Sequence, residues 1–211
     1  MKSNPRRSQA KMMRLLVTAV LAVTGICSAE IKPEKLVASA RKQIGVTISY
    51  DPAYRQLDYP GGDAPKHTGV CTDVVIRALR EQGVDLQKEV HEDMKANFNA
   101  YPKKWGLKKP DRNIDHRRVP NLMTYFRRKG FSRVESAKAE HFASGDVVAW
   151  DLGSGVTHIG IVSDRRSPKG TPTVIHNIGR GTQEEDILFE FKIIGHYRVS
   201  QLGDSARLKS Q

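Results

Sequence analysis

The sequence is poor in cysteine, with only Cys27 and Cys71 among 211 residues. A disulfide framework is therefore excluded, and no C-x-x-C or H-x-x-x-H ligand pair and no H-E-x-x-H motif occurs. Cys71, His158 and His176 could bind zinc in principle, but they are far apart in the sequence. We keep zinc as a minor alternative and expect no metal and no cofactor.

Long apolar runs are also missing. The run Leu15–Ile26 is too short to span a membrane comfortably, and it follows a basic, acid-free region. With the small residues Cys27-Ser28-Ala29 behind it, the pattern is typical of a secretory signal peptide that is cleaved before Glu30. An uncleaved anchor is the alternative, and the bulky Ile26 disfavours lipid attachment at Cys27. We predict a periplasmic or secreted bacterial protein with no membrane span after cleavage.

Acidic residues are outnumbered, 23 against 35 lysines and arginines. Cleavage of the leader would remove five basic residues and leave a net charge of +7 on residues 30–211. A basic exported protein suits an anionic polymer such as a bacterial envelope, although the charge could serve solubility alone. No arrangement of aromatic residues with arginine and glycine points to nucleic acid, so we expect none as a partner. The mature length suits one domain, and we expect a monomer.

The order of apolar patterns predicts an α+β fold. Helical spacing recurs over about 31–44, 71–82, 88–100 and 120–129, whereas 147–150, 156–162, 173–178 and 189–197 read as strands joined by turns. Helices followed by a four-stranded antiparallel meander indicate helices packed on one sheet. We expect long loops at 51–68 and 101–119, a domain over 30–199 and a polar tail over 200–211. The basic 101–119 segment is either a solvated surface loop or a flap that binds anions.

Cys71 lies at the start of the helix predicted over 71–82. Unpaired backbone N–H groups and the helix dipole favour an anion there, so we expect the pKa of this thiol to be lowered. Since Cys71 would be the single cysteine of the mature chain, it cannot form an intramolecular disulfide. The alternatives are a nucleophile and a buried cysteine that only packs.

A cysteine nucleophile needs a base, which is usually histidine, and a third group that orients the base. Of seven histidines, His158 and His176 lie on predicted strands and are flanked by apolar residues. If the two strands are neighbours, both imidazoles could come within hydrogen-bonding reach. The alternative is that each is a hydrogen-bonded histidine of the sheet without a catalytic role.

These features together resemble the NlpC-type branch of the papain-like cysteine peptidases, which cut cell-wall peptides. The most specific parts are the turn at Gly145-Asp146 and the strand start His158–Ile161. A narrower resemblance is to the bacterial family called domain of unknown function 1287. It is carried by Tyr50–Tyr54, Gly69–Asp73 and Val174–Asn177.

The resemblance implies a papain-like fold with Cys71 as nucleophile, His158 as general base and acid, and His176 as the group that orients His158. The backbone N–H of Cys71 would contribute to an oxyanion hole. Tyr50 falls near a tyrosine that the NlpC-type branch often keeps before the cysteine, so we treat it as a candidate for substrate or oxyanion binding.

One departure concerns the residue before the cysteine. NlpC-type enzymes carry an acid there that grips the amine of the peptide, but this sequence has Val70. Asp73 is a candidate for that role, although it could simply be an acid at a helix start.

We therefore predict an exported cysteine amidase or peptidase that hydrolyses an amide bond of peptidoglycan stem peptides through a thioester. Two alternatives stay open. One is an acyltransferase or amidase that acts on another envelope substrate. The other is a non-catalytic module that binds the cell envelope.

Overall fold

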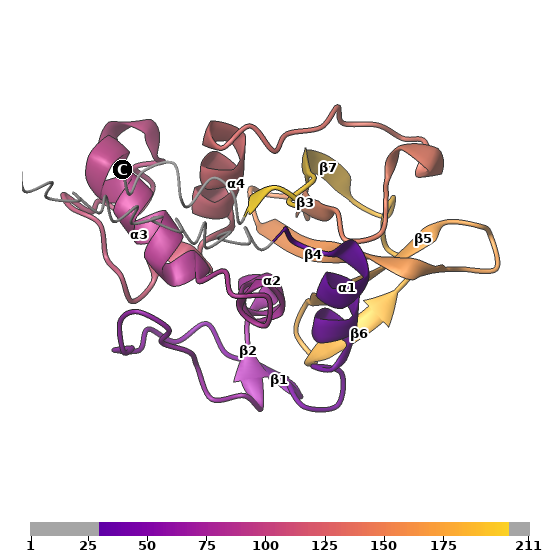
Figure 1. The fold of residues 1–211 in the computed structure, drawn as a ribbon, viewed down its shortest axis with the longest axis horizontal. Coiled ribbons are helices and arrows are strands. Elements are labelled where there is room, and N and C mark those ends of the chain that lie inside the picture. The colour runs from indigo at the N-terminus through magenta and orange to yellow at the C-terminus, as the bar shows by residue number, and fades with distance from the viewer. Residues whose placement is uncertain (1–29, 203–211) are drawn as a thin grey trace, which may run out of the picture.

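Helices come first and most strands later along residues 30–202, the part of the chain that the computed structural model describes (Figure 1). The helices are α1 (Pro33–Arg41), α2 (Cys71–Arg80), α3 (Leu86–Asn97) and α4 (Val119–Arg128). The strands are β1 (Ser49–Tyr50), β2 (Thr68–Gly69), β3 (Val147–Asp151), β4 (Thr157–Arg166), β5 (Pro172–Asn177), β6 (Thr182–Glu185) and β7 (Lys192–Tyr197). The predicted α+β class is confirmed.

The larger sheet has five antiparallel strands in the order β6-β5-β4-β3-β7. Its β3-β4-β5 part is the predicted meander, but two expectations were wrong. The last strand pairs with β3 at the opposite edge rather than with β5, and β6 was not predicted. The sequence of β6, Thr-Gln-Glu-Glu, has no apolar alternation, and its charges suit the edge of a sheet, where no further strand pairs. For the same reason β4 was predicted too short, because its last residues are polar.

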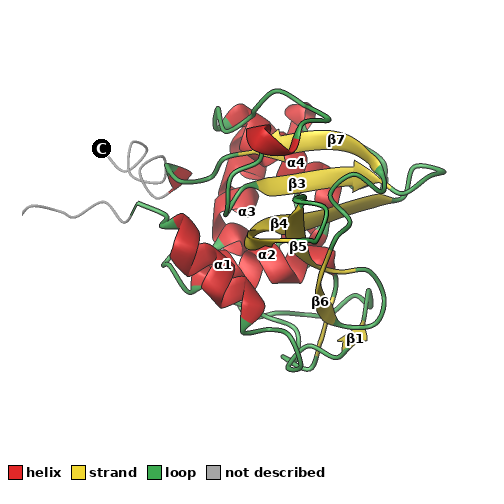
Figure 2. Cartoon of the chain, turned by 90° about the vertical axis from the view of Figure 1, so that its right-hand side faces the viewer, coloured by secondary structure: helices red, strands yellow, loops and turns green. Residues whose placement is uncertain are grey.

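Two apolar layers form on the two faces of this sheet. α1, α2 and α4 all contact β4 (Figure 2). The helix-side core joins their apolar residues to Ala149, Ile159, Ile161 and Ile175. Alternate residues of the same strands, including Trp150 and Val174, point to the other face, where Phe142 and Leu188 cover them. Because successive side chains of a strand alternate between the two faces, the side chains of His158 and Ile159 point to opposite faces of the sheet.

The small sheet brings Tyr50 beside the start of α2. β1 and β2 are parallel, with Ser49 opposite Thr68 and Tyr50 opposite Gly69. The predicted loop over 51–68 is irregular except for Thr68, and α2 holds it through Arg77, which donates to the carbonyls of Ala64 and Thr68 at 3.1 Å each. The chain before Cys71 is therefore fixed against the helix that Cys71 begins.

Packing at the C-terminal end continues past the predicted domain limit at residue 199. Ser200 accepts a hydrogen bond from the Ile31 N–H at 2.9 Å, and Leu202 is buried. Among residues 30–202, no helix combines the length and apolar character needed to cross a membrane. The predicted signal peptide over 1–29 and the tail beyond 202 lie outside the described residues.

Candidate active site

The N-terminus of α2 carries Cys71 as its first helical residue, as predicted. Val70 precedes the helix in an extended conformation, and its N–H donates to Asp73 Oδ2 at 2.7 Å. Asp73 therefore acts as the acid that satisfies a backbone N–H at the helix start. This local pattern fixes the direction in which the helix presents Cys71 and explains why the helix begins there.

Cys71 is only 3% exposed and lies in the helix-side core with Ile159. Burial raises the pKa of its thiol to about 11, while hydrogen bonds from the backbone N–H of Ile159 and Thr72 and from the Tyr50 hydroxyl oppose this rise. The expected lowering of the pKa at the helix start is therefore wrong for this buried thiol. Desolvation of a fully buried thiolate outweighs the favourable backbone dipoles.

His158 and His176 contact each other as the sequence predicted. His158 Nε2 and His176 Nδ1 are 3.0 Å apart, and both side chains are buried. The β4–β5 register places His176 next to Gly160, so the two imidazoles are diagonal neighbours on one face of the sheet. A Cβ atom at Gly160 would lie 2.7 Å from Val174 Cγ1 and 3.1 Å from His176 Cβ. The glycine after His158-Ile159 thus leaves the room that His176 occupies.

The far nitrogen of His176 meets a residue that the sequence did not identify. His176 Nε2 lies 3.0 Å from Glu185 Oε2, and Arg180 pairs with Glu185 in turn. Glu185 belongs to the unpredicted strand β6, so only the pairing of β6 with β5 reveals it. The histidine pair therefore continues into a carboxylate at the edge of the sheet.

Cys71 lies near the two residues that flank His158 in the sequence. Thr157 lines the same pocket as Cys71, and the Ile159 N–H contacts the thiol. Within residues 30–202, no hydrogen bond joins Cys71 to either imidazole. Since His158 Nε2 contacts His176, Nδ1 is the ring nitrogen of His158 that this contact leaves free.

Both imidazoles are electrically neutral near pH 7. Burial, with a smaller contribution from the charge of His176, lowers the pKa of His158 to about 3. Burial also lowers the pKa of His176, although Glu185 opposes this effect. The free site consequently holds a neutral thiol and neutral imidazoles rather than a thiolate–imidazolium pair.

These lowered pKa values predict a loss of stability in acid. His158 and His116, whose pKa burial lowers to about 4, stay neutral in the folded chain but take up protons near pH 6.5 when unfolded. Stability is therefore present above pH 6.5 and falls as the pH drops toward the folded pKa values, by up to about 1.4 kcal/mol per pH unit for each histidine. Urea titrations at several pH values should show a shallower slope for His158→Gln and His116→Gln. An unchanged slope in both variants would refute this assignment.

Tyr50 lies at Cys71, as the resemblance implied. The pKa of its hydroxyl is raised, first by burial and then by the neighbouring Cys71, so the group stays a hydrogen-bond donor at neutral pH. Tyr50 is 40% exposed overall, and it lines the pocket into which Cys71 opens. It is therefore placed to face both the thiol and a bound molecule.

Asp73 is engaged by the protein itself. Arg117 Nε donates to Asp73 Oδ1 at 3.0 Å and Arg117 Nη2 donates to Oδ2 at 2.9 Å, and both side chains are buried. Arg117 also donates to the carbonyls of Asp51 and Ala53 at 3.1 and 3.3 Å. This geometry favours the structural reading of Asp73 over recognition of a substrate amine.

The basic 101–119 segment divides into two parts. Lys103, Lys104, Lys108, Lys109 and Arg112 are exposed, which fits a solvated surface. Asp115, His116 and Arg117 are buried, and Arg117 ties the segment to the start of α2 and to the 51–68 loop. The segment is therefore partly a structural bridge, which neither sequence interpretation anticipated.

An open pocket of about 430 Å³ lies over Cys71. Its wall includes the aromatic side chains of Tyr50, Tyr54 and Trp105 and the basic side chain of Arg118. The Arg118 guanidinium stacks on the Trp105 ring at 4.1 Å. None of the described residues that line the pocket is a carboxylate, so it suits an aromatic or anionic group better than a free amine.

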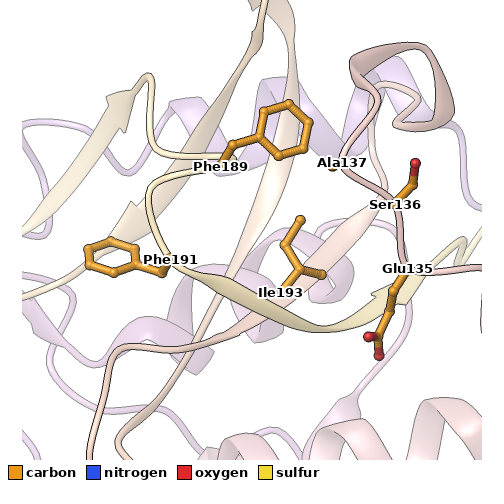
Figure 3. Close-up of a pocket in the computed structure, with 6 residues that line it drawn as sticks. All are labelled: Glu135, Ser136, Ala137, Phe189, Phe191 and Ile193. Carbon is orange, nitrogen blue, oxygen red and sulfur yellow. The ribbon is translucent and has the colours of Figure 1, made fainter.

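A second pocket, of about 520 Å³, lies away from this chemistry. Figure 3 shows it between the 135–137 segment and the start of β7, with Phe189, Phe191 and Ile193 on one side. Its described lining offers apolar surface and neither a thiol nor an imidazole. Size alone would select this pocket, whereas Cys71 and the residues around it select the smaller one.

The Gly145-Asp146 turn, one of the parts that carried the resemblance, has a structural role. Asp146 accepts hydrogen bonds from Arg198 Nε and Nη2 at 2.8 Å each and lies 2.7 Å from His196 Nε2. The turn therefore ties β3 to β7 rather than to Cys71.

Among residues 30–202, no group of three or more histidine, cysteine, aspartate or glutamate residues is arranged to hold a metal ion.

Comparison with known proteins places the chain in a family. The family described as domain of unknown function (DUF1287) matches residues 37–199, so the chain belongs to it, as the sequence motifs predicted. An uncharacterised protein of Escherichia coli strain K12, YijF, is 62% identical over 159 residues, which cover 75% of this chain and 78% of that protein.

One solved structure resembles the chain more distantly. It is a protein of Staphylococcus aureus described as similar to a lipoprotein of the NLP/P60 family, with a TM-score of 0.39 and 14% identity. The match covers 81% of this chain but only 43% of that one, so this chain spans less than half of that structure's length. The link to the NlpC-type peptidases thus stays a resemblance carried by the sequence motifs.

Proposed function

We propose that this protein is a thiol-dependent amide hydrolase of the bacterial envelope, with peptidoglycan stem peptide as its substrate. The observation that carries the proposal is the convergence at β4. Cys71, at a helix N-terminus, contacts the Ile159 N–H, and the adjacent His158 is hydrogen-bonded to His176 at 3.0 Å. In this proposal Cys71 on α2 is the nucleophile, His158 on β4 is the base, and His176 on β5 is the group that orients the base.

Because the Cys71 thiol and the His158 imidazole are both neutral at rest, the first step includes a proton transfer between them. As Cys71 Sγ attacks the amide carbonyl carbon, its proton passes to His158 Nδ1, and the carbonyl oxygen becomes an oxyanion. The Cys71 N–H, which the helix start presents, and the Tyr50 hydroxyl are the donors for this oxyanion. Because the negative charge moves from sulfur to oxygen as it forms, the enzyme never has to hold a free thiolate in a buried site.

The remaining steps return every group to its starting state. The C–N bond breaks, His158 Nδ1 donates its proton to the leaving amine, and the acyl group stays on Cys71 as a thioester. His158 then accepts a proton from water, whose oxygen attacks the thioester carbonyl. Cleavage of the C–S bond returns the proton to sulfur and releases a carboxylic acid. The sum is one amide and one water converted to an amine and an acid.

Substrate choice is supported by three weaker observations. The leader-like segment over 1–29 and the basic mature chain suit an exported protein that meets an anionic polymer. The wall over Cys71 carries Arg118 and aromatic rings, and Val70 stands where an amine-binding acid would be expected. A stem peptide that presents a carboxylate to this wall, rather than a free amine, fits the pocket.

The test is digestion of purified peptidoglycan and its soluble fragments by the mature chain, analysed by mass spectrometry. We expect wild type to release a pair of fragments that together have gained one water, and Cys71→Ala to release none. Binding to sacculi by both proteins without cleavage would support the non-catalytic module instead. A thioester on Cys71 that transfers only to an added amine would support the acyltransferase.

A further inference from the structure

We infer that Glu185 is a positioning residue that sets the tautomer of both histidines and so makes His158 Nδ1 a proton acceptor. Its effect on the rate rests on the proposed function, whereas its effect on the tautomers does not. The inference comes from the line of contacts that runs from Glu185 through His176 to His158.

The Glu185 carboxylate lies at the His176 end of this line of contacts. His176 is fully buried, and Glu185 Oε2 lies 3.0 Å from its Nε2. No atom among residues 30–202 meets full hydrogen-bond geometry at that nitrogen, so the 3.0 Å approach of the Glu185 carboxylate is its polar contact. Arg180 pairs with the other carboxylate oxygen, Oε1, and so holds Glu185 against His176. An ionised carboxylate only accepts, so the proton of neutral His176 belongs on Nε2.

The tautomer of His158 follows from that of His176. With its proton on Nε2, His176 has a lone pair on Nδ1, and the 3.0 Å contact then requires a proton on His158 Nε2. Neutral His158 carries one ring proton, so its Nδ1 is left unprotonated. That nitrogen is the one not engaged by His176. The carboxylate on β6 thus determines the state of a base on β4, two rings away.

Without an acceptor at residue 185, the opposite arrangement becomes available. His176 can then carry its proton on Nδ1 and donate to His158 Nε2, which moves the proton of His158 to Nδ1. This form keeps the same 3.0 Å contact and the same net charge, but it blocks the base. If Glu185 only stabilised the fold, its replacement would not change which of the two tautomer arrangements the histidines adopt.

The experiment is NMR of the full mature chain with ¹⁵N-labelled histidine. In wild type we expect a protonated Nε2 and an unprotonated Nδ1 on both His158 and His176, and in Glu185→Leu a loss of that dominance in both rings. Glu185→Gln, whose amide oxygen still accepts, should restore the wild-type pattern at least in part. Wild type with the proton on His158 Nδ1, or a pattern unchanged in Glu185→Leu, would overturn the inference.

The neighbouring Glu184 provides a matched control. Its side chain accepts from Arg41, Ser163 and Thr173 rather than from a histidine. Glu184→Gln should therefore lower stability and leave both tautomers unchanged, which separates damage to β6 from loss of the acceptor. If the wild-type chain hydrolyses peptides, Glu185→Leu should also lower kcat about 10–100-fold with little change in KM. Absence of hydrolysis in wild type would count against the proposed function and leave the NMR result as an independent test.

Discussion

Replacing Arg117 with leucine is expected to lower the free energy of unfolding by about 3–5 kcal/mol. Arg117 and Asp73 form a bidentate ion pair, with side chains 2% and 4% exposed. Removal of the guanidinium leaves the Asp73 carboxylate buried and without its cation, and it also frees the carbonyls of Asp51 and Ala53. The loss should be visible as a lower midpoint of urea denaturation at neutral pH.

Arg112, an exposed arginine in the same segment, is the matched control. Arg112→Leu should change the free energy of unfolding by less than about 0.5 kcal/mol. The double variant Asp73→Leu/Arg117→Leu should be more stable than Arg117→Leu alone, because it no longer buries an unpaired charge. A loss below about 1 kcal/mol in Arg117→Leu would show that the pair is not the link between α2 and the two loops.

The helices and the central strands were predictable because their apolar residues follow the period of the element. α2 is the clearest case, since Val74, Val75, Ala78 and Leu79 recur on one face and all are buried. The position of Cys71 at its first turn follows directly from that pattern. The same reasoning placed His158 and His176 on strands, and the β4–β5 register then brought them together.

The edge of the sheet was not predictable in the same way. β6 is short and polar, so its existence does not follow from alternation. β7 was predicted as a strand, but its place at the opposite edge of the sheet does not follow from alternation either. Glu185 became visible only when β6 paired with β5. The partner of Asp73 was hidden for a similar reason, because Arg117 lies 44 residues away in a segment with no periodic pattern.

The chemical state of the site also depends on burial, which a local motif does not report. A helix N-terminus alone predicts a lowered thiol pKa, but burial of Cys71 raises it to about 11, although the Ile159 N–H opposes the rise. The three-dimensional environment therefore changes the expected resting form from an ion pair to two neutral groups. It leaves the proposed roles in place, since a neutral imidazole is the form that accepts a proton.

Replacing His158 with alanine is expected to slow the acylation of Cys71 by about 10²–10⁴-fold. The proposed step needs a base for the thiol proton, because burial keeps the thiol protonated at neutral pH. The reaction can be followed with an activated ester as the mass added to Cys71, so no natural substrate is needed. In wild type the rate should be flat above about pH 5, since the pKa of His158 is about 3.

His196→Ala is the control for removal of a buried histidine from the same sheet. His196 lies 2.7 Å from Asp146, away from Cys71, so its loss should cost stability but leave the acylation rate within about twofold at a temperature where the variant is folded. Equal rates in wild type and His158→Ala would mean that the thiol reacts without a base. Cys71 would then be a cysteine that packs against Ile159, and the convergence at β4 would serve the fold rather than hydrolysis. A large loss in His158→Ala alone would instead tie the reactivity of Cys71 to the imidazole that His176 holds.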